Sequence, residues 1–360
     1  MRKGWEYKRW KEVLTIINGK NQSAVVDENG EYPIYGSGGI MGYANNWLCP
    51  GNCVIIGRKG NINKPIFVET KFWNVDTAFG LNANKEYLLP KFLYYFCLDY
   101  NFERHNKAVT IPSLTKADLL KIDIPLPPKS TQLAIVSELD KINELIRLNK
   151  EQLKDFDNLA QSLFYEMFGD PVENEMRWEV KKLGDVCTFS QGMQVPIEKQ
   201  KVMPHEGYVR FLRIIDFTQG KDAPRYVECD NDKYILHEKE IAIVRYGTPG
   251  FVCTGLVGAI ANNLFKLNPI SDNTFIFEYL VHWLSSSAFQ SSIKGRQYGA
   301  ALQAIKFSTI QNINILIPPL PLQHLFAQRI EQIEHQKAEV QKSITDLETL
   351  LASRMQYWFE

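Results

Sequence analysis

Apolar residues recur at alternating intervals of three and four over residues 130–168, the heptad pattern of a helix that buries one narrow seam. Pro127 and Pro128 prevent an earlier helix start, and Ser130 or Thr131 is expected to cap the first turn. A Gly-Asp-Pro sequence follows the pattern and ends it. A helix of about 39 residues is about 58 Å long at a rise of 1.5 Å per residue.

The same heptad pattern returns in the C-terminal segment 321–360, 191 residues further on and in the same register. We expect the two helices to pack on each other in antiparallel directions, rather than in parallel or each against its own globular part. Antiparallel packing would place one globular part at each end, related by a pseudo-twofold axis. Asn149 and Val340 would then lie near the axis, with Asn149 partly solvated or bonded to backbone. The expected helix-pairing residues are Leu139, Ile142, Ile146, Leu153, Phe156, Ile330, Ile333, Val340, Ile344 and Leu347.

Much of the chain occurs twice. The segment IPLPPKSTQ at 124–132 reappears as ILIPPLPLQ at 315–323, and WEYKR at 5–9 matches WEVKK at 178–182. The offset grows from 173 to 191 residues, so the second copy carries 18 extra residues, most of them before the counterpart of Cys53. A duplicated module predicts a protein that holds a partner with two ends. The expected segments are two recognition domains, 1–129 and 170–320, and two spacer helices, 130–169 and 321–360.

Both globular segments mix helical and strand patterns, so we expect an α+β fold. Short apolar runs at 53–56 and 241–244 are typical of buried strands. Helical patterns follow near 90–100 and 277–294. The segment RFLR at 210–213 alternates basic and apolar residues, which predicts a strand with both arginines on one face.

The composition limits the possible partners and compartments. The 360 residues carry a formal net charge of +0, so a nucleic-acid-binding surface requires basic residues gathered on one face. No run of about 18 apolar residues predicts a membrane span. The amino-terminal sequence is charged and aromatic, which argues against a secretory signal, and we expect a cytoplasmic protein. The six cysteines and six histidines lack the spacing of a metal site.

Motifs of catalysis are missing from the sequence. The glycine-rich segment 35–42 fails the dinucleotide fingerprint because Met41 stands where glycine is required, and no P-loop lysine follows. A turn that brings backbone close to a partner is the better interpretation. The chain has neither the N/D-P-P-F/Y motif of adenine methyltransferases nor a Walker A motif. We therefore expect a non-enzymatic binder without a metal or cofactor of its own.

A basic, glycine-bearing turn follows each apolar run, GRKG at 57–60 and RYGT at 245–248. Arginine binds guanine through two hydrogen bonds and also binds phosphates, and a neighbouring glycine lets backbone approach the ligand. An ordinary solvated charged turn is the alternative interpretation. The candidate nucleic-acid-binding residues are Tyr35, Ser37, Arg58, Lys59, Lys107, Arg210, Arg213, Arg245, Tyr246, Arg296 and Tyr298.

Together these features resemble the specificity subunit of type I restriction-modification enzymes. The resemblance is carried by GEYPIYGSGGIMGY at 30–43, PGNCVIIGRKG at 50–60, IDIPLPPKSTQ at 122–132, LFYEMFGDP at 163–171 and NINILIPPLPLQ at 312–323. It implies two target-recognition domains, each binding one half of an asymmetric, split double-stranded DNA target. It also implies long helices that set the spacing and bind two methyltransferase subunits. Those subunits would bring S-adenosylmethionine, and restriction subunits, if present, would use ATP and Mg²⁺.

Two other functions agree with parts of the sequence. A non-DNA adaptor, with two recognition domains on a coiled-coil spacer, would hold two protein partners. Neutral charge suits such an adaptor, which predicts no salt-sensitive DNA binding. A divergent nuclease or methyltransferase would instead show turnover by the isolated chain.

Overall fold

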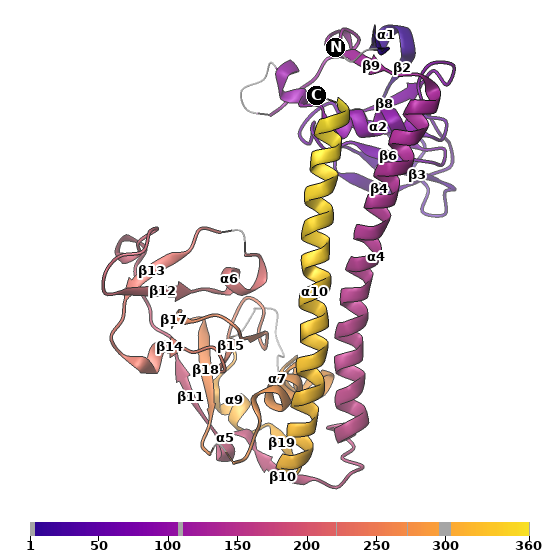
Figure 1. Ribbon diagram of the computed structural model, residues 1–360. Helices are drawn as coiled ribbons and strands as arrows, with labels where there is room; N and C mark the ends of the chain where they lie inside the picture. Colours follow the sequence, from indigo (N-terminus) through magenta and orange to yellow (C-terminus); the bar gives the residue numbers. More distant parts are fainter. Residues whose placement is uncertain (1–3, 107–110, 221, 272, 295–303, 360) are drawn as a thin grey trace. The chain divides into compact units, whose positions relative to one another are not determined.

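The protein is described here by a computed structural model that covers residues 4–106, 111–220, 222–271, 273–294 and 304–359 (Figure 1). The chain divides into two compact units. Unit 1 spans residues 1–151 and 341–360, and unit 2 spans residues 152–340. Each unit mixes helices and strands, which confirms the expected α+β class.

Unit 1 contains two sheets and one further strand pair. The four-stranded antiparallel sheet has the order β2-β8-β5-β6, with β2 Leu14–Asn18, β5 Cys53–Gly57, β6 Ile66–Val68 and β8 Ala78–Ala83. The three-stranded sheet has the order β4-β3-β7, with β3 Tyr32–Gly36, β4 Gly39–Ala44 and β7 Trp73–Asn74. β1 (Glu6–Arg9) pairs antiparallel with β9 (Asp123–Leu126). β5 is buried along its whole length, as its unbroken apolar sequence predicts.

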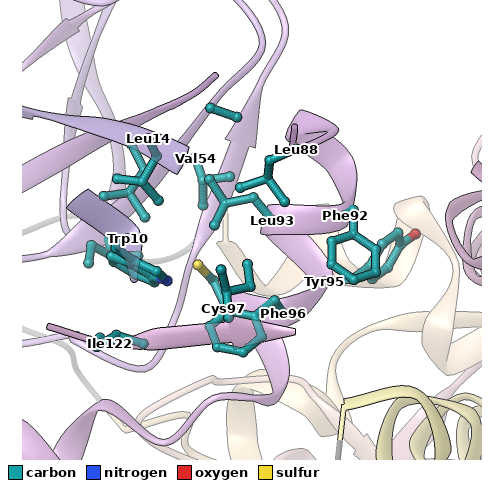
Figure 2. Packing of buried hydrophobic residues seen from close by; sticks show 14 of the residues in the cluster. Trp10, Leu14, Val54, Leu88, Phe92, Leu93, Tyr95, Phe96, Cys97 and Ile122 are labelled. Carbon is teal, nitrogen blue, oxygen red and sulfur yellow. The ribbon is translucent and has the colours of Figure 1, made fainter. Parts of the chain in front are cut away.

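The core of unit 1 lies between the four-stranded sheet and α2. The helices are α1 Trp10–Val13, α2 Pro90–Asp99, η1 Phe102–His105 and α3 Lys116–Leu119. Figure 2 shows the indole of Trp10 beside Phe96 of α2, with ring centroids 6.3 Å apart. Phe359, at the C-terminal end of the chain, packs on Phe92 and Phe96 at 5.3 and 6.1 Å. Truncating one such buried aromatic ring costs about 3–5 kcal/mol.

Unit 2 repeats this strand order. Its sheets are β11-β18-β15-β16 and β13-β12-β17-β14, and β10 pairs with β19. The parallel pairing of β12 with β17 matches that of β3 with β7. The strand bounds are β10 Glu179–Lys182, β11 Cys187–Gln191, β12 Tyr208–Leu212, β13 Arg225–Glu228, β14 Ile235–Leu236, β15 Ile241–Val244, β16 Val252–Cys253, β17 Gly258–Ile260, β18 Leu264–Pro269 and β19 Asn314–Ile317.

The short helices of unit 2 correct two predictions. They are α5 Leu183–Val186, η2 Ile197–Lys199, α6 Ile214–Thr218, η3 Asp232–Tyr234, α7 Phe277–Ser285, α8 Ser287–Lys294 and α9 Phe307–Gln311. The helical pattern near 277–294 is split, because Ser286 has extended backbone and its hydroxyl donates to the Trp283 carbonyl at 2.7 Å. Arg213 does not belong to β12. It directly precedes α6, and Asp216 in the first turn of that helix accepts its backbone N–H at 2.9 Å.

The long helices are α4 (Lys129–Phe168) and α10 (Leu320–Phe359), of 40 residues each. At 1.5 Å per residue each is about 60 Å long. In unit 1, Glu138 pairs with Arg354 and Lys150 with Glu348; in unit 2, Asp157 pairs with Lys337 at 2.8 Å. In unit 1 the partner's number in α10 falls from 354 to 348 as the α4 number rises from 138 to 150, so the helices run antiparallel, as expected.

The seam between the long helices is apolar. The predicted pairing residues Leu139, Ile142, Ile146, Ile330, Ile333 and Ile344 are buried, and Leu153, Phe156, Val340 and Leu347 are half-buried. Asn149 is half-buried, so it is partly solvated, which was one of the two expected states; its amide donates to the hydroxyl of Ser343 at 2.9 Å rather than to backbone. The small serine brings its hydroxyl within reach of the facing helix.

The start of each long helix is fixed by a buried glutamine. Ser130 and Thr131, expected to cap α4, lie inside its first turn instead, because the Pro128 carbonyl already accepts the Thr131 N–H at 2.9 Å. Gln132 and Gln323 have no solvent exposure. Their bonds are equivalent. Gln132 accepts the N–H of Leu89, just before α2, at 2.9 Å and donates to the carbonyls of Tyr87 and Pro127. Gln323 accepts the N–H of Ile276, just before α7, at 2.9 Å and donates to the carbonyls of Thr274 and Pro318.

Candidate nucleic-acid interface

The turn after β5 presents two exposed cations, Arg58 and Lys59. The backbone of Arg58 is held on both sides: its N–H donates to Thr77 at 2.8 Å, and its carbonyl accepts from Leu114 at 2.9 Å. Its guanidinium lies 5.7 Å from the centre of the Phe79 ring. A fixed backbone with solvent-facing cations is an arrangement that binds phosphates.

Unit 2 holds Arg245 by the same backbone bonds. Its N–H donates to Asn263 at 2.8 Å, and its carbonyl accepts from Ile305 at 2.9 Å. The guanidinium lies 5.9 Å from the Phe307 ring centre, and its Nε also donates to the Ile305 carbonyl at 3.4 Å. Arg245 is consequently half-buried. Gly247 has φ +95°, which glycine adopts without strain.

The residue after each arginine gives the two turns different chemistry. Lys59 is exposed and charged. Tyr246 is 40% exposed, and its hydroxyl donates to the Asn262 side chain at 3.4 Å. The same backbone scaffold thus presents a cation in unit 1 and an aromatic hydroxyl in unit 2.

The β3–β4 hairpin tip lies beside the basic turn of unit 1. Ser37 and Gly38 join the strands, and a Cβ placed on Gly60 would be 3.9 Å from the Ser37 hydroxyl oxygen. Tyr35 is half-buried and packs edge-on against Phe72, with ring centroids 5.6 Å apart. Burial raises the pKa of the Tyr35 hydroxyl. Ser37 therefore joins the basic turn at one surface, whereas the Tyr35 ring helps to support the hairpin.

Arg210 and Arg213 converge on one carboxylate. Asp216 lies 3.0 Å from Nε of Arg213 and 3.5 Å from a terminal nitrogen of Arg210, and its side chain is only 2% exposed. Arg213 also pairs with Asp222 at 3.2 Å. Sequence reasoning missed Asp216, although an acidic residue in the first turn of a helix can accept the backbone N–H of the residue before that helix. Both arginines are therefore part of an internal ion-pair network.

Three predicted residues, Lys107, Arg296 and Tyr298, lie outside the described residues. Within the described part of the chain, no cluster of three or more His, Cys, Asp or Glu side chains has the arrangement of a metal site. Burial raises the pKa of the Cys53, Cys187 and Cys253 thiols to about 12, which keeps them protonated. In the same described ranges, no helix has both the length and the apolar character to cross a membrane.

A cavity of about 830 Å³ lies between α7 and α10 in unit 2. Glu278, Glu331 and Glu334 line it together with His282. Desolvation lowers the pKa of His282 to about 4, so its ring is neutral at physiological pH. Carboxylates repel DNA phosphates, and this cavity is therefore a poor candidate for the nucleic-acid interface.

Comparison with known proteins shows one family. The profile of the type I restriction modification DNA specificity domain matches residues 2–155 and 175–349. A Haemophilus influenzae protein assigned to the type I restriction enzyme specificity subunits is 25% identical over 350 residues, covering 91% of this chain and 87% of that protein. The EcoDI specificity subunit of Escherichia coli is 19% identical over 382 residues, covering 95% and 84%.

The fold is shared with a solved structure of the same family. The S subunit of the type I restriction-modification system of M. genitalium superposes with a TM-score of 0.58 at 15% identity. The match covers 99% of this chain and 96% of that one. The agreement extends to both copies of the duplicated module.

Proposed function

The chain belongs to the type I restriction modification DNA specificity family, and we propose that units 1 and 2 each bind one half of a split DNA target. Recognition of a DNA target within a type I restriction-modification complex is its function, and the DNA and the other subunits of that complex are its partners. The two halves of the target differ in sequence, because the surfaces that face solvent differ between the units.

The equivalence of the two basic turns is the main observation that supports DNA binding by both units. Arg58 and Arg245 have the same backbone bonds to two neighbouring segments, yet Lys59 is replaced by Tyr246. Equivalent backbone bonds keep each turn in place, and exchanged side chains change what the turn binds. Phosphate contacts position such a domain, and contacts to base edges make it specific.

The long helices are proposed to set the spacing of the two half-sites and to bind two methyltransferase subunits. Half-sites one turn of DNA apart are separated by about 34 Å. A helix of about 60 Å is long enough to define a separation on that scale. Restriction subunits would complete the cleaving complex.

Catalysis is assigned to those partners. We propose that this chain has no enzymatic activity, that the methyltransferase subunits bind S-adenosylmethionine, and that the restriction subunits use ATP and Mg²⁺. The absence of methyltransferase and Walker A motifs from the sequence supports this division. A cytoplasmic location, where chromosomal DNA is accessible in a bacterium or archaeon, is part of the same proposal.

Mapping N6-methyladenine across the genome, with and without this gene, tests the proposed function. We expect one split, asymmetric motif to lose its methylation on deletion. The complex reconstituted with its methyltransferase subunits should bind that motif with an affinity that falls steeply with salt. Identical maps, together with salt-independent or undetectable binding, would contradict the proposal.

A further inference from the structure

Strand β4 exposes two consecutive apolar side chains. Ile40 is 57% exposed and Met41 is 63% exposed. In a regular strand, neighbouring side chains point to opposite faces. Here the pairing with β3 shifts from Ile34–Gly42 to Tyr35–Ile40, which leaves Met41 without a cross-strand partner in a β-bulge. A bulge redirects side chains at a sheet edge, and β4 is the edge strand of its sheet.

This apolar edge adjoins the cations of unit 1. A Cβ placed on Gly38 at the hairpin tip would lie 3.6 Å from the Asn61 side chain, next to the turn that carries Arg58 and Lys59. The acidic residues Asp27, Glu28 and Glu31 precede β3, at the end of the hairpin away from its tip. Exposed apolar side chains beside fixed cations match a partner that is apolar inside and anionic outside.

The DNA major groove is such a partner. It is about 12 Å wide and admits a two-stranded β-ribbon. Phosphates flank it, and the thymine C5-methyl group is the main apolar feature on its floor. Isoleucine and methionine lack hydrogen-bonding groups that discriminate other base edges, so a methyl contact is the recognition that they offer.

We propose that the β3–β4 hairpin enters the major groove of the half-site bound by unit 1, and that Ile40 and Met41 contact thymine methyl groups there. The proposal rests on the proposed function of unit 1 as a DNA-binding domain. It makes the two side chains determinants of specificity, and it requires thymine in that half-site. In unit 2 the strand equivalent to β4 is the edge strand β13, which carries no exposed apolar side chain, so no such methyl contact is expected there.

Replacing thymine by deoxyuridine removes only the methyl group and therefore tests the contact directly. The complex with its methyltransferase subunits is measured on target duplexes substituted in one half at a time. We expect each relevant replacement in the half bound by unit 1 to weaken wild-type binding about fourfold, the effect of one buried methyl group. Exchange of residues 1–129 for the domain of a relative identifies which half that is.

Two variants test whether Ile40 and Met41 are the side chains that contact the methyl group. With Ile40→Ala and Met41→Ala, thymine and deoxyuridine duplexes should bind nearly equally, because the side chain that contacts the methyl group is gone. Leu98→Ala removes an exposed apolar side chain from α2 and should retain the wild-type sensitivity. Because the wild-type measurement needs no variant, a misfolded variant does not remove the test.

The hairpin proposal is overturned by equal wild-type affinity for thymine and deoxyuridine duplexes, or by a half-site that contains no thymine. Ile40→Ala and Met41→Ala variants that keep the full wild-type sensitivity would overturn it as well. In each case specific binding of the unmodified target leaves the proposed function intact. Failure to bind any target in a salt-dependent way would instead contradict the proposed function.

Discussion

Asp216 is the residue on which the ion-pair network of Arg210 and Arg213 depends. Its carboxylate is 2% exposed and accepts from both Arg210 and Arg213. We expect Asp216→Ala to lower the free energy of unfolding of unit 2 by about 2 kcal/mol, because two partly buried cations lose their shared partner. Denaturant titration measures the change. Asp222→Ala is the matched control: that carboxylate is exposed and pairs with the partly exposed Arg213, so its loss should cost under about 1 kcal/mol. Equal losses for both variants would contradict this account.

His282 makes the stability of unit 2 depend on pH. Its ordinary pKa is about 6.5, and burial lowers the folded value to about 4. As the pH falls below about 6.5, the unfolded chain takes up a proton that the folded ring does not. The stabilisation is complete above about pH 6.5 and is lost toward pH 4, by at most about 3 kcal/mol.

The measurement is denaturant unfolding between pH 7.5 and 5. His282→Leu should flatten the dependence of unfolding free energy on pH over this range. His335→Leu, at an exposed position of α10, should leave the wild-type slope unchanged. A slope that survives His282→Leu would assign the dependence to other groups.

At the scale of elements, the length of the paired long helices is proposed to set the distance between the two half-sites. Deleting seven residues, 143–149, from α4 alone shortens that helix by about 10 Å and offsets its contacts with α10. We expect such a single deletion to weaken assembly with the methyltransferase subunits. Deleting 343–349 from α10 as well restores the seven-residue register of the seam.

The double deletion should assemble and methylate a target whose spacer is shorter by about three base pairs, since one base pair rises about 3.4 Å. Methylome mapping reports the spacer length directly. A double-deletion protein that methylates the unchanged target would show that the helices do not set the spacing.

Elements with a clear local pattern of apolar residues were predictable from the sequence, and element ends that depend on distant contacts were not. The heptads of α4 and α10 and the apolar runs of β5 and β15 carry their structure in their own sequence. The end of β12 does not, because Asp216 begins α6 by bonding to Arg213. The partner of Asn149 also depends on a residue in another helix, Ser343.

The candidate site was predictable to a similar extent. The arginine-bearing turns were found because a basic, glycine-containing turn directly follows an apolar strand. Asp216 was missed because its role needs Arg210, which is six positions away and on a different element. The support given to the hairpin by Tyr35 depends on Phe72, which is far away in sequence. Contacts of this kind need the folded chain.

At the scale of the whole molecule, duplication predicts that the two halves of the target are independent. Exchange of residues 1–129 for the corresponding domain of a relative should change one half of the methylated motif and leave the other half and the spacer unchanged. Methylome mapping of the hybrid measures all three. A hybrid whose motif changes in both halves would contradict independent recognition.

The paired glutamines, Gln132 and Gln323, have a consequence for engineering. Each glutamine bonds only to backbone groups of its domain, so this part of the attachment does not depend on which side chains that domain carries. For these bonds a transplanted domain supplies one N–H and one carbonyl, and the remaining carbonyl comes from the proline before the helix. It must also match side-chain contacts such as those of Lys91 and Tyr95 with Asp140 of α4. Libraries of recombined domains can therefore keep both glutamines on one scaffold, and the junction then needs matching only at the side chains that contact the long helices.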